Sequence, residues 1–326
     1  MLQLMGGADI TLAISCLAQL GVPDLVEAGP RSADDLAREI GAHPGALYRL
    51  MRATASVGVL SEGPDGKFSQ TPLSAVLHSN ANPSLRAFAI MGARDWWLRG
   101  WQRLEYSVRT GKTALDDVYG MPLWEHFKRN PAEAQIFNDG MTNLSMLDSP
   151  AVADAYSFHG IDSVVDVGGG HGLLLATILS RNPNLRGTLF DAPHVVEGTK
   201  EGPLKPYLPR CTLAAGDMFS SVPAGADAYM MKHIIHDWPD DRCIQLLKLC
   251  RNAVKPGGKL LVIDCVIQPG NDYHPAKFLD LAMLMFPGGK ERTETEFREL
   301  FAASGWRLNR LLPTASTEAI VEGLPA

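Results

Sequence analysis

Two histidines, His233 and His236, lie in the segment M-K-H-I-I-H-D-W-P at residues 231–239. The segment follows a β-rich run at residues 226–230, so its polar groups are expected at the carboxyl end of a strand, where open α/β sheets bind ligands. An imidazole with a pKa of about 6.5 can take a proton from a hydroxyl group at neutral pH. We therefore predict that a histidine of this segment acts as a general base.

A histidine base needs an acceptor on its other ring nitrogen, which fixes the tautomer and the orientation of the ring. Two carboxylates are candidates for this acceptor. Asp264 ends the next β-rich run, at residues 259–263, and Glu291 lies in G-G-K-E-R-T at residues 288–293. The sequence leaves open which of the two orients the histidine.

The same histidines offer a second interpretation, as metal ligands. Because residues three apart share a helix face, His233 and His236 could bind a metal ion together with Asp237 or Asp240. The apolar residues between and beside them indicate a packed element instead of an open ligand shell. We expect no metal.

Glycines follow another apolar run in V-V-D-V-G-G-G-H-G, residues 164–172, just before a helical pattern at 173–179. Glycines at such a strand-to-helix turn let the backbone approach a ligand closely. The dinucleotide fingerprint G-x-G-x-x-G would need a third glycine where Leu173 stands. A nucleotide-like ligand is therefore predicted, while an NAD-dependent oxidoreductase is a weaker alternative and a plain tight turn another.

Acidic residues mark the ends of two further runs, Asp191 in F-D-A-P-H and Asp217 in G-D-M-F. A carboxylate at the carboxyl end of a strand is well placed to accept hydrogen bonds from ribose hydroxyls. The two acidic positions predict that a ribose-bearing ligand lies across this edge of the sheet.

Elements that would position these motifs are visible in the second half of the chain. The β-rich runs at 163–167, 187–190, 226–230 and 259–263 alternate with helical patterns, which predicts an α/β fold with a parallel, doubly wound sheet.

The first part of the chain has a different pattern. An apolar helix at 10–20, helices at 32–41 and 44–56 and a hairpin at 59–69 give the order of a winged helix. The helix at 44–56 carries only Arg49 and Arg52, so a role in packing or dimerisation is favoured over DNA reading, although a winged-helix regulator that senses a small molecule stays an alternative. Long helical patterns with many aromatic residues follow, and we expect them to link the domains and wall a pocket. The predicted domains are residues 1–83, 84–154 and 155–326.

Composition excludes several protein classes. A formal net charge of -6 gives no basic field for nucleic acid. The five cysteines form no C-x-x-C pair, which argues against a disulfide framework and a thiolate zinc site. No apolar run reaches the roughly 18 residues of a membrane span, and the charged start of a secretory signal is missing. We expect a cytoplasmic protein without membrane or nucleic-acid partners.

Taken together and in this order, V-D-V-G-G-G-H-G, F-D-A-P-H, G-D-M-F, M-K-H-I-I-H-D-W and P-G-G-K-E-R-T resemble the S-adenosylmethionine-dependent small-molecule O-methyltransferases. The likeness is to the plant caffeic acid and hydroxyindole type and its bacterial secondary-metabolite branch. It implies a Rossmann-like methyltransferase sheet with an N-terminal, mostly helical, winged-helix dimerisation domain. The implied reaction is methyl transfer from S-adenosylmethionine to a hydroxyl of an aromatic small molecule, with S-adenosylhomocysteine as product.

The resemblance also assigns residues. His236 matches the catalytic base and Glu291 one of its two supporting carboxylates, while Asp264 departs from the glutamate that many relatives carry. The implied donor contacts are Gly168, Gly170, Asp191, Ala192, Asp217, Met218, Lys232, Phe137 and Ser145. The implied acceptor contacts are Met141, Trp238, Met283 and Phe286.

In this family the N-terminal domain forms an intertwined dimer and lends residues to the partner's pocket. The resemblance therefore implies a homodimer. The identity of the aromatic acceptor and the position of its reacting hydroxyl are not readable from the residues.

Overall fold

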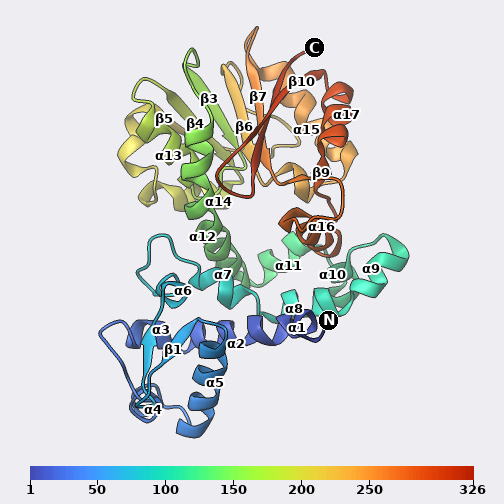
Figure 1. Cartoon of the computed structure of the whole chain (residues 1–326). Coiled ribbons are helices and arrows are strands. Elements are labelled where there is room, and N and C mark those ends of the chain that lie inside the picture. Colours follow the sequence, from blue (N-terminus) through green and yellow to red (C-terminus); the bar gives the residue numbers. More distant parts are fainter. The chain divides into compact units, whose positions relative to one another are not determined.

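The structure is a computed structural model that describes residues 1–326, apart from the side chain of Gln3 (Figure 1). The chain forms two compact units, one of Met1–Gln102 with Glu125–Met146 and one of Arg103–Trp124 with Leu147–Ala326. Helix α12 (Pro131–Ala155) contributes residues to both units. The predicted division after residues 83 and 154 stays a prediction. In the part of the chain that the structure describes, we find no helix with the length and apolarity needed to cross a bilayer.

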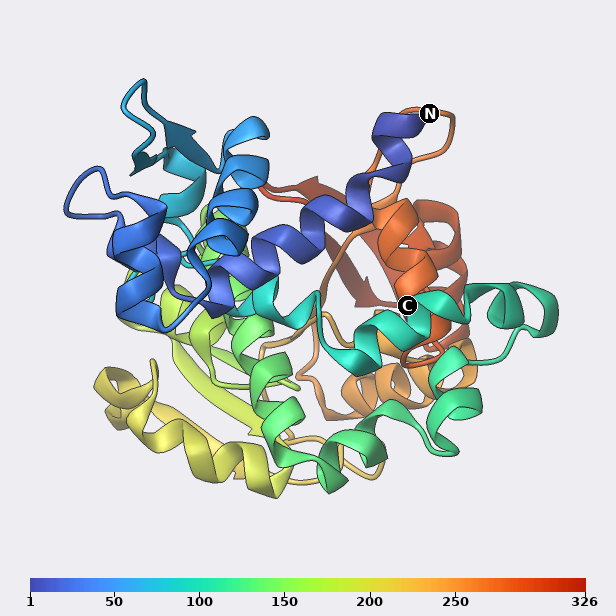
Figure 2. The same ribbon diagram turned by 90° about the horizontal axis from the view of Figure 1, so that it is seen from below.

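The N-terminal unit begins with the predicted order of helices and hairpin. Its first elements are α1 (Leu2–Met5), α2 (Gly7–Gln19), α3 (Val22–Leu25), α4 (Ala33–Ile40), α5 (Pro44–Ser56), β1 (Leu60–Glu62) and β2 (Phe68–Gln70). Helix α4 begins where the Ser32 side chain accepts a hydrogen bond from the Asp35 amide, and it ends at Gly41, whose φ is 70°. Helices α2 and α5 pack on each other and bury Leu17 and Met51 in one apolar cluster (Figure 2).

Shorter helices follow, as the helical patterns predicted. They are α6 (Pro72–Ala75), α7 (Arg86–Met91), α8 (Asp95–Gln102), α9 (Leu104–Thr110), α10 (Ala114–Tyr119) and α11 (Leu123–Arg129). Within the N-terminal unit, Asn143 of α12 accepts a hydrogen bond from the amide of Ala87 at 2.9 Å. Arg94 and Glu133 form an ion pair at 2.6 Å. These contacts tie α12 to the start of α7 and to the segment before α8.

The second unit is built on a seven-stranded sheet with the order β10-β11-β7-β6-β3-β4-β5. The strands are β3 (Ser163–Val167), β4 (Arg186–Asp191), β5 (Cys211–Ala215), β6 (Ala228–Lys232), β7 (Lys259–Asp264), β10 (Trp306–Pro313) and β11 (Ala319–Pro325). The four predicted strands, β3, β4, β6 and β7, are parallel, and so is β5, whereas β11 pairs antiparallel with both β7 and β10. Strands β5, β10 and β11 were not among the predicted strands, so the predicted parallel sheet is the larger part of a mixed sheet. A connection of five residues, 314–318, can join only antiparallel neighbours, because a parallel return needs a long crossover.

Helices cover both faces of this sheet. Helix α13 (Leu173–Arg181) packs on one face, and α15 (Asp240–Ala253) and α17 (Glu294–Ala303) pack on the other. Two further helices of this unit are α14 (Pro193–Gly198) and α16 (Pro275–Met285). Successive strand residues alternate between two clusters: Met231 packs in the cluster that contains α15 and α17 residues, and Met230 in the one that contains α13 residues. With both faces buried, the edge formed by the carboxyl ends of the parallel strands is left for ligands.

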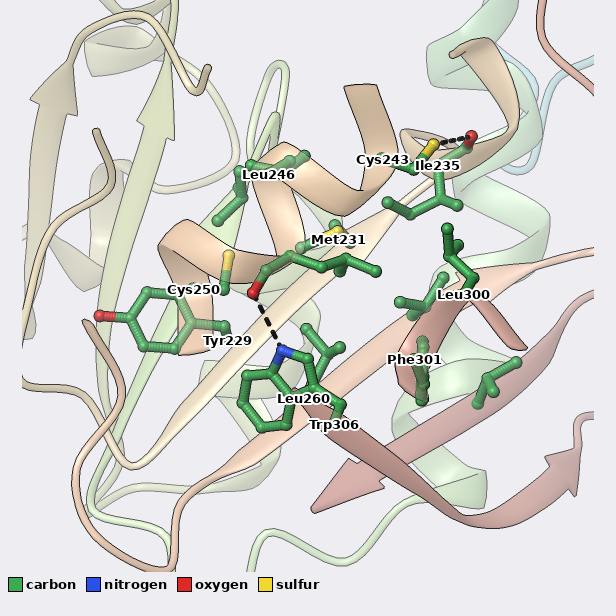
Figure 3. Packing of buried hydrophobic residues seen from close by; sticks show 14 of the residues in the cluster. Tyr229, Met231, Ile235, Cys243, Leu246, Cys250, Leu260, Leu300, Phe301 and Trp306 are labelled. Atoms are coloured by element: carbon green, nitrogen blue, oxygen red, sulfur yellow. Dashed lines mark hydrogen bonds between the residues drawn. The ribbon is translucent and has the colours of Figure 1, made fainter. Parts of the chain in front are cut away.

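Trp306, at the start of β10, packs in the core between the sheet and helices α15 and α17 (Figure 3). Its ring is fully buried, and its indole nitrogen donates a hydrogen bond to the Leu247 carbonyl of α15 at 2.9 Å. Tyr229, Leu260 and Phe301 pack in the same cluster. The antiparallel edge is thereby joined to the parallel part of the sheet through a helix as well as through backbone pairing.

We expect Trp306→Phe to lower the free energy of unfolding by about 2 kcal/mol, because it removes one buried hydrogen bond and part of a large ring. Urea unfolding followed by circular dichroism measures the change. Tyr273→Phe is the control, since Tyr273 is 79% exposed. An equal midpoint for the Trp306 variant and the native chain would contradict this account of the core.

Candidate active site

Four neighbouring parallel strands bring the predicted site residues to one edge of the sheet. Gly168 follows β3, Asp191 and Lys232 end β4 and β6, and Asp264 ends β7. The register pairs Val167 with Phe190 across β3 and β4. These polar residues, far apart in the sequence, thus share the carboxyl edge that strand alternation predicted.

The glycine loop between β3 and α13 leaves its backbone open at one point. Gly168 and Gly170 have φ of 69° and 56°, a region that side chains rarely adopt. A Cβ on Gly168 would collide with Ile234, whereas a Cβ on Gly170 would meet nothing within 4 Å. Gly168 is therefore required by packing, and Gly170 presents bare backbone that a ligand can approach.

Asp191 lies beside this loop and is held by backbone amides. One carboxylate oxygen accepts from the Gly170 amide at 2.8 Å and the other from the Ala192 amide at 2.6 Å. Burial raises the pKa of Asp191, and these two hydrogen bonds oppose the rise. Since a carboxylate has about four lone-pair directions, both oxygens keep capacity to accept from a diol. The loop and the carboxylate fit the ribose and methionine parts of an S-adenosyl donor.

His236 is buried in the short 3-10 helix η3 (Ile235–Asp237), close to three carboxyl groups. Its Nδ1 lies 2.7 Å from Glu291 Oε1 and 3.9 Å from Asp264 Oδ1. Its Nε2 lies 3.6 Å from Asp237 Oδ1. The geometry makes Glu291 the hydrogen-bond partner of the ring, because 3.9 Å is beyond hydrogen-bond range.

The carboxyl groups around His236 are strongly perturbed by burial. Burial raises the pKa of Glu291 to about 8, and the nearby Asp280 adds to the rise. Burial also raises the pKa of Asp264 and of Asp237 to about 7 each, with His236 opposing the rise in both. Among the described groups, both oxygens of Asp264 and Oε2 of Glu291 find no hydrogen-bond partner. Perturbed carboxyls around one imidazole are typical of a site for proton transfer.

Comparison with known proteins agrees with this geometry. Residues 101–307 match the O-methyltransferase domain, and residues 2–80 match the O-methyltransferase dimerisation domain. The chain is 39% identical to a phenazine O-methyltransferase of Lysobacter antibioticus over all of this chain and 95% of that protein. It is 40% identical to the mitomycin biosynthesis 6-O-methyltransferase of Streptomyces lavendulae, over 95% of this chain and 89% of that protein.

The chain belongs to the O-methyltransferase family. The crystal structure of LaPhzM superposes with a TM-score of 0.94 at 39% identity, covering 100% of this chain and 98% of that one. Solved relatives hold S-adenosylmethionine or S-adenosylhomocysteine, and the family is metal-independent. The enzyme transfers a methyl group from S-adenosylmethionine to an aromatic hydroxyl of a small molecule in secondary metabolism. The NAD oxidoreductase and the DNA-binding regulator are thereby excluded as identities.

The remaining predicted donor contacts of this O-methyltransferase lie in different surroundings. Asp217 is exposed, and its carboxylate accepts from the Phe219 amide at 3.0 Å and from the Ser220 hydroxyl at 2.7 Å within its own turn. Met218 packs beside the sheet cluster. Lys232 Nζ lies 3.5 Å from Asp148 Oδ2, and both side chains are 9% exposed. Their contacts with the donor stay predictions.

Residues predicted on α12 lie in the N-terminal unit, in the part of the helix up to Met146. Phe137 packs on Phe127 with ring centroids 4.9 Å apart. Met141 and Ser145 are half-buried. Contacts of Phe137 and Ser145 with the donor, and of Met141 with the acceptor, stay predictions.

The other predicted acceptor contacts, Trp238, Met283 and Phe286, all belong to the second unit. Trp238 packs edge-to-face on Phe219, with ring centroids 4.7 Å apart. Met283 is half-buried on α16, and Phe286 is buried where that helix ends. Their role toward the acceptor also stays a prediction.

Arg292 is a positioning residue that sequence reasoning missed. It is 1% exposed and donates to the carbonyls of Ile235 at 2.9 Å and Trp238 at 3.1 Å, and to Asp240 at 2.7 Å. The two carbonyls flank His236 in sequence, so the guanidinium clamps the loop that carries His236. The signal was its place next to Glu291 in G-G-K-E-R-T, because one short strand, β9 (Arg292–Thr293), follows Glu291 directly.

The structure does not bring His233 and His236 together as metal ligands with Asp237 or Asp240. The two rings stack instead, with centroids 5.0 Å apart. A different group, Asp148, His233 and Glu318, has ligand atoms within 4.8 Å of one another. The Lys232 ammonium beside Asp148 already supplies positive charge there.

We expect Gly170→Ala to weaken binding of S-adenosylhomocysteine by about tenfold or more, because the new methyl group projects into the space open to a ligand. Isothermal titration calorimetry measures the Kd. Gly225→Ala is a matched control, since Gly225 also has positive φ, 85°, and a Cβ there would meet nothing within 4 Å. Equal Kd values for the two variants would contradict the role given to the loop.

Proposed function

We propose that His236 is the general base of the reaction and that Glu291 orients it. The observation that carries the proposal is the contact of 2.7 Å between His236 Nδ1 and Glu291 Oε1, with both side chains at most 8% exposed. An ionised Glu291 only accepts hydrogen bonds, so it holds the hydrogen on Nδ1 and leaves the lone pair of Nε2 free. Nε2 then takes the proton of the acceptor hydroxyl.

The donor supplies an electrophilic methyl group when it is bound. Gly168, Gly170, Asp191 and Ala192 would hold it, and the bare backbone at Gly170 supports that assignment. The chain's contribution to rate is to hold the acceptor hydroxyl in line with the methyl group of the bound donor, and orientation of this kind recovers roughly 7 to 11 kcal/mol. Removal of the proton by a base adds about 10²–10⁴-fold.

For the acceptor we propose a hydroxyl on a fused aromatic ring system such as a phenazine. The support is the 39% identity to a phenazine O-methyltransferase over the whole chain. The test is a screen of hydroxyphenazines, hydroxyquinones and simple phenols with labelled donor, followed by mass spectrometry of products.

We expect His236→Ala to reduce kcat on the acceptor found in that screen by about 10²–10⁴-fold while the Kd of S-adenosylhomocysteine stays within about twofold. The reason is that the imidazole acts on the acceptor proton and lies outside the glycine loop. Stopped assays give kcat, and calorimetry gives Kd. Loss of donor binding with turnover preserved would refute the assignment.

The two supporting carboxylates should differ in their effect. We expect Glu291→Gln to lower kcat by about 10²-fold and Asp264→Asn by less than about tenfold, because only Glu291 is within hydrogen-bond distance of the ring.

Burial raises the pKa of Glu291 to about 8, and only its ionised form holds Nδ1–H. In the native enzyme kcat should therefore rise with pH up to about 8 and then level off. In Glu291→Gln this dependence should be lost, and an unchanged profile would contradict the role of Glu291.

We also propose that the enzyme is a cytoplasmic homodimer. The match of residues 2–80 to the dimerisation domain supports the dimer. So do the apolar side chains of the first helices that lie exposed, Leu2 at 85% and Leu4 at 81% among them. Its five cysteines are free, which suits a reducing compartment.

Light scattering coupled to gel filtration should give twice the chain mass. Leu2→Asp with Leu4→Asp should shift it toward the mass of one chain, because the added charges oppose burial of these helices. A native protein that elutes at the mass of one chain would refute the dimer.

A further inference from the structure

His233 has a backbone conformation found at no other described non-glycine residue. Its φ is 55°, in the left-handed region. For a residue with a Cβ this region is strained, and it persists where neighbouring contacts impose it. The residue directly follows β6 and precedes the loop of His236, so the unusual turn sets where the ring of His233 points.

The contact that holds His233 comes from the loop before β11. Its Nε2 lies 3.2 Å from Oε1 of Glu318, which is 5% exposed. Glu318 also accepts from the hydroxyls of Ser316 at 2.6 Å and Thr317 at 3.0 Å. Burial works against ionisation of Glu318, but hydrogen bonds from His233 and Ser316 outweigh it and hold its pKa below the ordinary value. An ionised Glu318 accepts only, so the hydrogen of His233 is assigned to Nε2.

The ring of His233 lies against the ring of His236. Their centroids are 5.0 Å apart and their planes differ by 28°, which is a stacked arrangement. Glu291 constrains His236 within the plane of its ring through Nδ1. A stacked neighbour constrains the tilt of that plane, which a single hydrogen bond leaves free.

The charged groups around the two rings keep His233 neutral. Burial lowers the pKa of His233 to about 3, and the adjacent Lys232 adds to the decrease. At working pH it therefore does not compete for the proton that His236 receives. The titratable groups that face the two rings from all the elements packed against them are Lys232, Asp148, Glu318, Asp237, Asp264 and Glu291.

We propose that His233, held by Glu318, is a positioning residue for methyl transfer, which keeps the ring of His236 at the tilt at which Nε2 meets the acceptor hydroxyl. The inference rests on the proposed role of His236 as the base. In the step that it serves, the hydroxyl O–H bond breaks and the Nε2–H bond of His236 forms, and the proton later leaves to solvent. His233 gains and loses no proton.

Three substitutions test the ring of His233 and its contact with Glu318. His233→Asn tolerates the left-handed backbone but has no ring, and its side chain is too short to replace Nε2 beside Glu318. His233→Phe keeps a ring without a donor. Glu318→Gln removes the negative charge. We expect kcat to fall about tenfold or more in both His233→Asn and His233→Phe, because the first lacks the ring and the second lacks the contact with Glu318 that holds it.

A pH readout distinguishes positioning from general stability. In protein with ¹³C-labelled histidine, NMR titration follows the pKa of His236 with no acceptor present. Glu318→Gln should lower that pKa by about half a unit to one unit, since an anion beside the paired rings favours the charged form of His236. Tyr156→Phe is the matched control, because it removes a 2.6 Å hydrogen bond to Glu322, another buried glutamate of the same edge, outside the His233 pair. It should leave both the pKa of His236 and kcat unchanged.

The inference is overturned if His233→Asn turns over like Tyr156→Phe, or if Glu318→Gln leaves the pKa of His236 in place. The failure of the proposed base looks different. In that case His236→Ala would itself retain turnover, whatever the His233 variants do.

Discussion

A buried hydrogen bond between an imidazole and a carboxylate, His236 to Glu291, is the constraint on which the site depends. Taking both groups out of water is costly unless each finds a partner, and the raised pKa of Glu291 reflects that cost. The surrounding structure must therefore hold the two groups within hydrogen-bond range. Each group comes from a different loop, 55 residues apart in the chain.

The elements around the pair supply that restraint. Arg292 follows Glu291 and donates to the carbonyls on either side of His236, so one short segment provides both the carboxylate that contacts His236 and the clamp for the loop that carries it. Gly289 lies so close to the backbone of 236–238 that a Cβ there would collide with it. His233 and Glu318 add a contact from the antiparallel edge. The site is therefore shaped by packing of backbone on backbone, which tolerates little displacement.

The antiparallel hairpin of β10 and β11 has consequences beyond completing the sheet. It brings Glu318 beside His233 and, on β11 itself, buries Glu322 against Tyr156. Trp306 at its start closes the core under α15. The last strands thus contribute both stability and a charged group near His233 and His236. The site therefore takes residues from the carboxyl edge of the parallel strands and from the loop at the antiparallel end of the sheet.

Much of this could be predicted from residue order. Alternating strands and helices implied the α/β sheet, glycines after β3 implied a ligand loop, and acidic strand ends implied a shared edge, because carboxyl ends of parallel strands must meet. Helices α4 and α5 were predicted to within a residue, since Ser32, Gly41 and Pro44 are local signals of where helices begin and end. Strands β10 and β11 were not predicted, so neither was the antiparallel end of the sheet, because the direction of a strand depends on how the chain returns to the sheet.

The sequence by itself determined the fold class, and it predicted a ligand loop and a small set of candidates for a base and its partner. Only the tertiary structure decided that Glu291 and not Asp264 bonds to His236, that Arg292 clamps the loop, and that His233 pairs with Glu318. The physical reason is the distance along the chain between the residues that set each feature. Secondary structure and turns follow from neighbours in the chain, whereas a difference between 2.7 Å and 3.9 Å depends on how separate loops pack in three dimensions.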